Sequence, residues 1–539
     1  MEIDAERLLF RRQFILGPQV SHGLAGWRGI EISDSVRLSV HPDLQSTDVQ
    51  HGSTRIVLLG YMLDPHNPTY SDQQILDAIA ERTGCFDDLI SAIDNYGGRW
   101  AIVYHDGRAS RIFHDACGLR QIYYMTTAGS VWCGSQPSIL RHAVGNVEED
   151  PAAIEVTQLP QYASRESSWF GDGTIYKGIR HLLPNHYLDL ADGTVHRYWP
   201  RDPIGHASLD KDFVDDLAHY ISGCLEAAAN RFELMIPITA GWDSRVLLAA
   251  SKRISSKVFY YISTMNMLPR NHQDVAVPSR LLEKLGLPFN IIDPDPEDDD
   301  QYRQIYFKNV TQARSLPKSL TIHHFFKHCQ GMVNVSGNGA EIGRGMLSSF
   351  YRSLFEASQS VSETGIVGTF HYKHDRQDQF PIGPRGFATV YGFGEVDYVV
   401  NAIGGWMAEC VPICSQYGLD ISDMYHWEQR LGNWGAMYQA EEDIAVEVLW
   451  PFNIRALLVK MLSVEITFRR PPQYLLYRKL ATHMWPKVLS EPVNPANQPS
   501  RVSRYRHAIG RRMPPFVRSC YRLLRDRIAG RTADKREPQ

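Results

Sequence analysis

Two short loops of small residues contain the groups with which this chain could do chemistry. The first is Thr239-Ala240-Gly241-Trp242-Asp243-Ser244, which follows the apolar run Leu234–Ile238. Small side chains leave backbone N–H groups accessible where the next helix begins, and such groups bind anions. A carboxylate beside an anion site is useful when Mg²⁺ joins it to a phosphate, so Asp243 indicates a magnesium–phosphate site. The alternative is an ordinary strand-to-helix turn, because such motifs also occur without a ligand.

The second loop is Ser336-Gly337-Asn338-Gly339-Ala340-Glu341, after the apolar run Met332–Val335. By itself it is typical of a structural glycine-rich turn. It becomes informative if it lies at the same sheet edge as the first loop.

The elements around the two loops place both at one sheet edge. From about residue 208, helical patterns alternate with short apolar runs, which predicts a parallel sheet with crossover helices. Ligands bind at the carboxyl ends of such strands, where both loops are expected. The predicted helices are Phe213–Asn230, Asp274–Leu285, Asp298–Lys308 and Leu320–Gln330, and the predicted strands are Leu234–Ile238, Val258–Ser263, Phe289–Ile292 and Met332–Val335.

The first 145 residues have a different pattern, with short alternating strands separated by turn residues. They predict an α+β domain, with a sandwich as the expected arrangement. The predicted strands are Arg55–Gly60, Trp100–Tyr104, Arg111–His114, Gln121–Met125 and Ser130–Gly134, and the predicted helices are Leu76–Arg82 and Asp87–Ile93.

Composition excludes several classes of protein. A net charge of −4 over 539 residues gives no electrostatic reason for nucleic-acid binding. The eight cysteines show neither a disulfide framework nor zinc-finger spacing, so Cys410 and Cys414 are interpreted as core or surface thiols. No apolar signal core follows the charged start, and the apolar stretch 399–414 is too short and too polar to span a bilayer. We therefore expect a cytoplasmic protein.

Several segments of the first 190 residues resemble class II glutamine amidotransferase domains, which have the fold of the N-terminal-nucleophile (Ntn) hydrolases. They are Tyr96–Tyr104, His114–Tyr124 and Gly134-Ser135, and Asp172–Leu190 is similar to the linker that follows this domain in asparagine synthetases. Pro184-Asn185-His186 stands where that family usually has Pro-Gly-His. The expected domains are therefore a degenerate glutaminase-like domain with its linker (1–200), a synthetase domain (208–495) and a basic C-terminal tail (496–539).

The N-terminal segments depart from the amidotransferases where the chemistry is. Glutamine hydrolysis in that family needs a cysteine after the initiator Met, whose α-amino group acts as general base. Position 2 is Glu and the first cysteine is Cys85. The glutamine-holding Asn-Gly-Glu tripeptide is also missing. The domain is expected to be a retained scaffold, as in beta-lactam synthetase and the lasso-peptide cyclases, which are similar in this respect.

The two loops together resemble the pyrophosphate loop and the second metal loop of asparagine synthetases. The resemblance implies an α/β synthetase domain, like the adenine nucleotide alpha hydrolases, that binds ATP and Mg²⁺. Asp243 and Glu341 would bind the metal. The resemblance places the nucleotide against Ile238, Thr239, Ala240, Gly241, Trp242, Asp243, Ser244, Ser263, Gly337, Asn338 and Gly339.

Two further positions depart from the asparagine synthetases. Asn338 stands where the family commonly has Asp and beta-lactam synthetase has a catalytic Tyr, and an amide cannot act as a base. Asn494 falls by counting on the lysine that stabilises the adenylation transition state. Lys487 or Lys479 could substitute for it, and Lys487 is the predicted catalytic residue beside Asp243 and Glu341. These losses leave a catalytically inactive homologue as an alternative.

The resemblance thus implies an ATP-dependent amide ligase that forms AMP and pyrophosphate without glutaminase activity. Its partners would be a small-molecule, peptide or glycan carboxylate and an amine. The alternatives are an inactive nucleotide-binding or scaffold homologue and an asparagine synthase that uses free ammonia.

Three other segments have weaker sequence signals. The region 346–420 matches the family poorly and is interpreted as an insertion or lid. The tail from Arg501 has twelve Lys and Arg residues, which fits contact with a membrane surface or an acidic partner, or a helix folded back on the domain. His324 and His328 have a zinc-like spacing but no third ligand nearby, so a surface helix face is expected.

Overall fold

The fold is taken from a computed structural model. It describes residues 4–19, 24, 26–164, 166–265, 267–314, 318–345 and 383–495. The described residues up to 493 form one compact unit, and residues 494 and 495 belong to a second unit. The basic tail and residues 346–382 of the predicted insertion lie outside the described residues. In the described part of the chain, no helix is long and apolar enough to cross a membrane.

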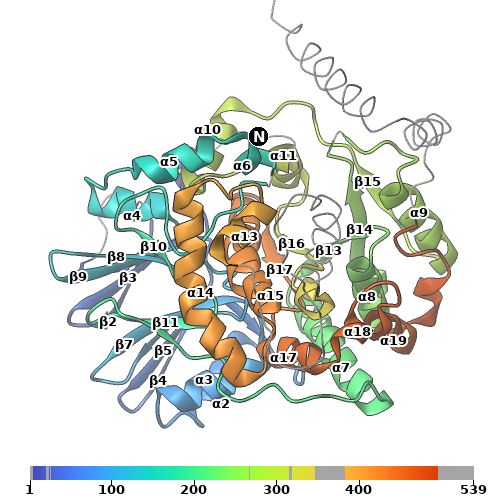
Figure 1. The fold of residues 1–539 in the computed structure, drawn as a ribbon, viewed down its shortest axis with the longest axis horizontal. Coiled ribbons are helices and arrows are strands. Elements are labelled where there is room, and N and C mark those ends of the chain that lie inside the picture. Colours follow the sequence, from blue (N-terminus) through green and yellow to red (C-terminus); the bar gives the residue numbers. More distant parts are fainter. Residues whose placement is uncertain are drawn as a thin grey trace, which may run out of the picture. The chain divides into compact units, whose positions relative to one another are not determined.

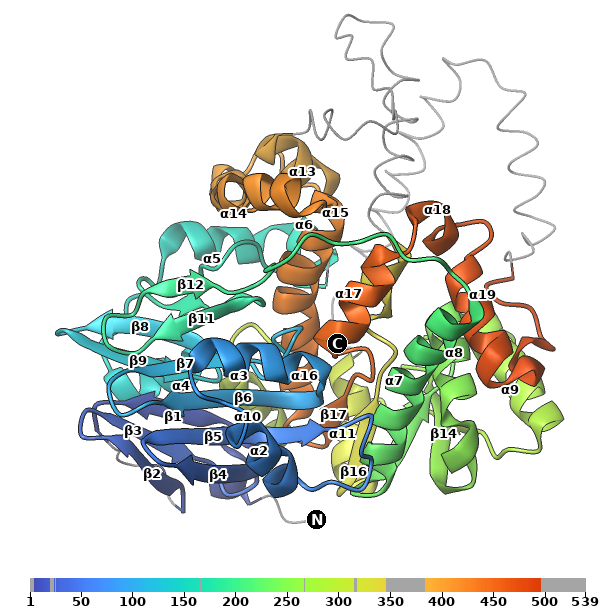
Figure 2. The ribbon, with the colours of Figure 1, turned by 90° about the horizontal axis from the view of Figure 1, so that it is seen from below.

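The N-terminal domain contains two antiparallel sheets (Figures 1 and 2). One sheet has the order β10-β8-β9-β1-β3-β2 and the other β12-β11-β7-β6-β5-β4. The strands are β1 (Phe14–Gly17), β2 (Arg28–Ser33), β3 (Val36–Val40), β4 (Ser46–His51), β5 (Thr54–Leu63), β6 (Gly97–His105), β7 (Ser110–His114), β8 (Tyr123–Thr127), β9 (Ser130–Gly134), β10 (Arg180–His181), β11 (His186–Asp189) and β12 (Val195–Arg197).

Strand β5 shows why these sheets stack into layers. Side chains alternate between the faces of a strand. Val57 and Leu59 belong to the core between the two sheets, while Ile56 and Leu58 pack under helices on the outer face. Both faces are therefore buried, as a helix–sheet–sheet–helix sandwich requires. The helices of this domain are α1 (Ala5–Leu8), α2 (Asp72–Ala80), α3 (Phe86–Ala92), α4 (Pro137–Val144), α5 (Pro151–Gln158), α6 (Pro160–Ser164) and the 3-10 turn η1 (Ile93–Asn95).

The start of β1 bears on glutamine hydrolysis. This strand begins with Phe14, which is fully buried and donates its N–H to Ser135 Oγ at 2.9 Å. The chain before it continues through α1, whose Leu8 packs in a cluster with Tyr302 and Tyr306. Strand β1 therefore begins with neither a cysteine nor a chain amine, the two groups that the hydrolysis requires.

The second domain is built on a parallel sheet in the order β15-β14-β13-β16-β17. The chain runs outward from β13 to β15, then returns to the other side of β13 and continues through β16 to β17. The order reverses between β13 and β16, which is the position where doubly wound sheets bind ligands. The strands are β13 (Glu233–Pro237), β14 (Val258–Ser263), β15 (Asn290–Ile292), β16 (Met332–Val335) and β17 (Glu447–Leu449).

Helices cover this sheet and extend to the end of the unit (Figure 2). From the start of this domain to the second loop they are α7 (Lys211–Ala229), α8 (Trp242–Ala250), η2 (Ser251–Lys257), α9 (Gln273–Leu285), α10 (Asp300–Asn309), α11 (Lys318–His328) and η3 (Ala340–Arg344). The later ones are α13 (Pro384–Val390), α14 (Asp397–Tyr417), α15 (Ile421–Met424), the π-helix η4 (Tyr425–Gly435), α16 (Ala436–Glu442), α17 (Arg455–Ser463), α18 (Ile466–Arg469), α19 (Leu475–Met484) and η5 (Pro486–Leu489). The predicted fold class, an α+β sandwich followed by a parallel-sheet α/β domain, is confirmed.

Two smaller expectations also hold. Cys410 and Cys414 are buried on α14 as free thiols. His324 is half-buried and His328 is exposed on α11, as expected of a surface helix face, and their rings are tilted by 47° with centroids 4.6 Å apart. Within the described residues, no group of three or more His, Cys, Asp or Glu side chains could hold a metal ion.

A buried ion network joins the two domains. Arg99 of β6 is 1% exposed and donates to Asp443 Oδ2 and Glu447 Oε1, each at 2.8 Å. Arg120 donates to Glu447 Oε2 at 3.1 Å, and Arg12 lies 3.9 Å from the same oxygen. Burial alone would raise the pKa of Glu447, but Arg120, Arg99 and Arg12 outweigh it and lower this pKa to about 2. Each domain thus supplies charges that the other must neutralise.

We expect that the protein releases no ammonia from glutamine, because β1 offers neither nucleophile nor amine base. A coupled glutamate dehydrogenase assay measures this directly. Ammonia release above the rate of a heat-inactivated sample would show that another group acts as nucleophile.

We expect Glu447→Gln to lower the free energy of unfolding by about 3 kcal/mol at pH 7, the linkage value for a carboxylate pKa lowered from 4.5 to about 2. This stability is present above pH 4.5 and is lost as the pH falls toward 2, so the difference from wild type should more than halve by about pH 3. Urea unfolding across this range measures it. Glu31→Gln, in the exposed pair with Arg37, is the control and should cost under about 0.5 kcal/mol. A difference independent of pH would contradict the assignment.

Candidate nucleotide site

The first loop crosses from β13 to α8 at the point where the strand order reverses. Ile238 continues the sheet, because its N–H donates to Tyr261 O at 2.8 Å. Gly241 is the N-cap of α8, and the first intrahelical hydrogen bond runs from Arg245 N to Gly241 O. The N–H groups of Trp242, Asp243 and Ser244 precede that bond and form the positive end of the helix dipole.

Three amides before that helix already have acceptors. Thr239 N donates to Ser244 Oγ at 3.0 Å, and Gly241 N donates to Thr239 Oγ1 at 3.2 Å. Ala240 N donates to Asp274 Oδ1 at 3.0 Å. These contacts hold the loop in shape but occupy amides that the sequence assigned to pyrophosphate. The first turn of α8 is therefore the better anion donor.

The second loop packs directly against the first. A Cβ atom on Gly337 would lie 2.9 Å from Asp243 Cβ, so this position needs glycine. Asn338 N donates to Ser336 Oγ at 3.3 Å, and Gly339 has a φ of +88° before η3 begins. These residues bring the two predicted metal ligands, Asp243 and Glu341, to one place.

Arg344 lies between the two carboxylates, a group that the sequence reasoning did not assign. Its Nη2 is 2.9 Å from Asp243 Oδ2 and 3.9 Å from Glu341 Oε1. Burial raises the pKa of Asp243 to about 7, Arg344 opposes the rise and Glu341 adds to it. Burial disfavours the charge of Arg344, but Asp243 and Glu341 outweigh this and raise its pKa. Two carboxylates on one guanidinium leave an excess negative charge. The i, i+3 spacing of Glu341 and Arg344 was the available sequence signal.

The carboxylates can accept a metal ion. Asp243 Oδ1 and Glu341 Oε2 are buried and have no hydrogen-bond partner among the described residues. In nucleotide sites Mg²⁺ uses one or two carboxylates, and phosphate and water complete its shell. The pair therefore fits Mg²⁺ held together with a phosphate ligand, although Arg344 now neutralises part of its charge.

The other predicted residues lie around this centre. Trp242 is buried and has its ring 5.9 Å from that of Tyr474 and 5.6 Å from the guanidinium of Arg478, so it packs rather than blocking the loop. Ser263 ends the neighbouring strand β14, and its Oγ lies 2.8 Å from Thr321 Oγ1.

The two lysines proposed as substitutes are placed less favourably. Lys487 is exposed on η5, and no described contact joins it to either loop, so its catalytic role stays a prediction. Lys479 donates from Nζ to Leu209 O at 2.6 Å. Asn494 belongs to the second unit and has a φ of 44°.

Arg245, in the first loop's helix α8, holds η5 in place by hydrogen bonds. This fully buried side chain donates to Val488 O at 2.6 Å and Pro492 O at 2.9 Å. It is bulky where a glycine-rich loop is usually lean, and its function here is to hold the end of the unit against α8.

His426 on η4 is another residue that the sequence reasoning missed. It is 5% exposed, and neither ring nitrogen has a hydrogen-bond partner in the described part of the chain. Burial lowers its pKa to about 3, and Arg430 and Arg344 contribute to the shift.

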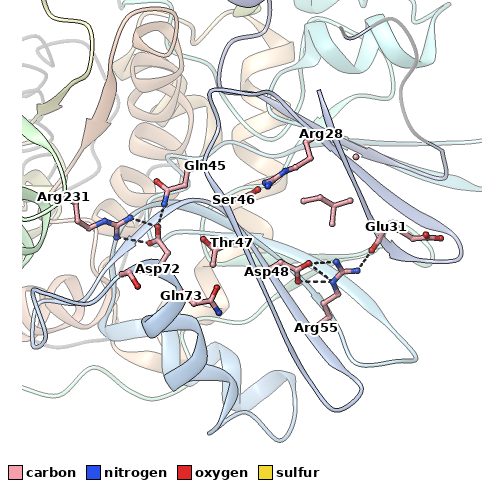
Figure 3. Close-up of a pocket in the computed structure, with 13 residues that line it drawn as sticks. Arg28, Glu31, Gln45, Ser46, Thr47, Asp48, Arg55, Asp72, Gln73 and Arg231 are labelled. Carbon is pink, nitrogen blue, oxygen red and sulfur yellow. Dashed lines mark hydrogen bonds and ion pairs between the residues drawn. The ribbon is translucent and has the colours of Figure 1, made fainter. Parts of the chain in front are cut away.

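A hollow of about 840 Å³ lies elsewhere, along the edge strands β2 and β4 of the N-terminal sandwich (Figure 3). None of the predicted site residues lines it. Its main charges are paired with each other, since Arg55 contacts Asp48 and Arg231 contacts Asp72. We therefore keep the two loops, which carry carboxylates without full partners, as the candidate site.

Comparisons with known proteins add little. No protein-family model matches the chain. No curated protein matches it either. One similar solved structure is glutamine phosphoribosylpyrophosphate amidotransferase from B. subtilis, complexed with ADP and GMP. The two sequences are 9% identical, the TM-score is 0.24, and the match covers 55% of this chain and 89% of that chain. Another is described as the allosteric regulatory enzyme of purine biosynthesis. It is 11% identical, has a TM-score of 0.24, and the match covers 57% of this chain and 75% of that chain. Likeness at this level says nothing about what this chain binds.

We expect Gly337→Ala to lower the free energy of unfolding by about 1–3 kcal/mol, because the added methyl group forces the two loops apart. Chemical denaturation measures the loss. Gly205→Ala is the matched control, since a Cβ there meets nothing within 4 Å, and it should be nearly neutral. Equal effects of the two substitutions would mean that the loops do not pack as described.

Proposed function

We propose that this chain is an ATP-dependent ligase that joins a carboxylate to an amine, with AMP and pyrophosphate as products. The observation that carries the proposal is the meeting of Asp243 and Glu341 at the switch point of a parallel sheet, beside the first turn of α8. A helix N-terminus and a carboxylate pair supply the two halves of a Mg²⁺–nucleotide site.

The reaction has two steps. A carboxylate oxygen of the substrate attacks the α-phosphorus of ATP, and pyrophosphate leaves with the P–O bonding pair. The amine then attacks the acyl carbon of the mixed anhydride, loses a proton and displaces AMP. Peptide and glycan carboxylates are the proposed substrate classes.

The residues of this chain would mainly position the phosphate groups and neutralise their charge through the bound metal ion. The N–H groups of Trp242, Asp243 and Ser244 would bind phosphate oxygens, and Asp243 and Glu341 would hold Mg²⁺. Bound Mg²⁺ supplies neutralisation of the phosphate charge. Phosphoryl transfer of this kind depends mostly on alignment and electrostatic stabilisation. Asn338 cannot take the proton of the amine, so no base is assigned.

A second candidate is a nucleotide-binding homologue without turnover. Three features favour this inactive homologue: Ala240 N donates to Asp274, residue 338 is an amide, and Lys487 is exposed. In either case the N-terminal domain serves as a scaffold. An asparagine synthase that uses free ammonia is a third candidate, with aspartate as the carboxylate.

We expect ATP–pyrophosphate exchange in the presence of Mg²⁺ and the right carboxylate. Asp243→Asn and Glu341→Gln should each lower the exchange rate by at least about 100-fold, which is the scale for removing one electrostatic group at a reacting centre. The assay uses labelled pyrophosphate with aspartate, short peptides and uronic acids. Asp295→Asn, in the exposed pair with Lys327, is the control and should stay within twofold of wild type.

The outcomes separate the candidates. ATP binding without exchange for any carboxylate would favour the inactive homologue. Asparagine formed from aspartate and ammonium would identify the third candidate. Absence of ATP binding with Mg²⁺ would overturn the proposal.

A further inference from the structure

Arg344 occupies the place of a cation in the candidate site. One nitrogen, Nη2, lies within ion-pair distance of both Asp243 and Glu341, at 2.9 and 3.9 Å. The other oxygens of these carboxylates, Asp243 Oδ1 and Glu341 Oε2, are buried without hydrogen-bond partners among the described residues. The guanidinium therefore satisfies only half of what the pair can bind.

The position of Arg344 is built into the fold. It ends η3, the short helix that carries Glu341, and its side chain is 14% exposed. Tyr477 donates its hydroxyl to Ala340 O at 2.5 Å, and Arg469 donates to Ile342 O at 3.4 Å. A Cβ on Gly343 would lie 2.3 Å from Met461 Cε, so this turn packs closely on α17. The backbone that presents Arg344 is thus fixed from both sides.

Charge then decides what the arginine can do. When both carboxylates are ionised, the pair and one guanidinium sum to −1, whereas the pair with a divalent ion sums to zero. Unit charges about 4 Å apart near a protein surface interact by several kcal/mol, so a guanidinium and a metal ion would compete strongly for this pair. A flexible side chain can also turn from a carboxylate to a phosphate, which Arg binds well.

We propose that Arg344 is an internal counter-cation, which holds Asp243 and Glu341 when no metal is bound and is displaced from them by a divalent ion. The displaced guanidinium then contacts nucleotide phosphate. Arg344 is a positioning residue for the metal and a direct contact for the nucleotide. This inference rests on the proposed nucleotide site but not on turnover.

Mn²⁺ binding to the full-length protein, measured by electron paramagnetic resonance in the absence of nucleotide, tests the inference. We expect Arg344→Gln to bind Mn²⁺ about tenfold or more tightly than wild type, because the competing charge is gone. Arg344→Lys keeps the charge and should bind Mn²⁺ within about threefold of wild type. Arg270→Gln, in an exposed pair with Asp293, is the matched control and should change nothing.

Two further measurements keep the test decisive. The double variant Arg344→Gln with Asp243→Asn should lose the gain in Mn²⁺ affinity, which ties the ion to these carboxylates. Circular dichroism checks that each variant is folded.

Titration with ATP and Mn²⁺ tests the nucleotide separately, and Arg344→Gln should weaken ATP binding about tenfold or more relative to wild type. Unchanged Mn²⁺ affinity in Arg344→Gln would overturn the inference. Absence of ATP binding in every variant, with the Mn²⁺ effect present, would remove the proposed function and the phosphate contact while the counter-cation role stands.

Discussion

The cost of burying charge ties the two domains together. Arg99 and Arg120 of the N-terminal sandwich are almost fully buried, and their carboxylate partners are Asp443 at the end of α16 and Glu447 on the edge strand β17. A buried guanidinium without a partner costs several kcal/mol, so neither domain can present this surface alone. Backbone contacts reinforce the junction, since Asn453 accepts from Cys117 N and donates to Gly98 O, each at 2.8 Å.

This junction gives the N-terminal domain a function that needs no catalysis. It braces the segment that leads through α16 into β17, and β17 lies beside β16, the strand that ends at the second loop. A second buried carboxylate continues the bracing, because Glu428 accepts from Arg197, Asn185 and Trp406. The N-terminal sandwich can thus support the parallel sheet whether or not it has chemistry of its own.

The buried charges of the candidate site are less completely paired than those of the domain junction. At the domain junction the buried carboxylates of Asp443 and Glu447 are paired with arginines, whereas Asp243 and Glu341 share Arg344 and keep two oxygens without a hydrogen-bond partner among the described residues. Structural ion pairs are satisfied in the free protein, and binding sites leave capacity for a ligand. The contrast within one chain supports the interpretation of the two loops as a site.

The sequence alone determined the fold class and most elements of the parallel sheet, because buried parallel strands are short apolar runs. The predictions for β14 and β16 agree with the structure to the residue. Strands β1 to β4 were not predicted one by one. Strand β4, Ser-Thr-Asp-Val-Gln-His, has a polar outer face, and its pairing with β5 supplies what its own pattern lacks. The sequence also singled out both carboxylates as predicted metal ligands, Asp243 from the small residues around it and Glu341 from the resemblance to asparagine synthetases.

Only the tertiary structure decided what surrounds those carboxylates. The strand order brought Asp243 and Glu341 together and so set Arg344 between them. Its i, i+3 spacing from Glu341 is visible in the sequence, but its contact with Asp243 is not. The same is true of Asn185: it stands where the resembling family has glycine, adopts a φ of +73°, and is held there by Glu428 from a distant helix. Partners of buried polar groups come from anywhere in the chain, so a sequence can place the carboxylates but not the charge that neutralises them.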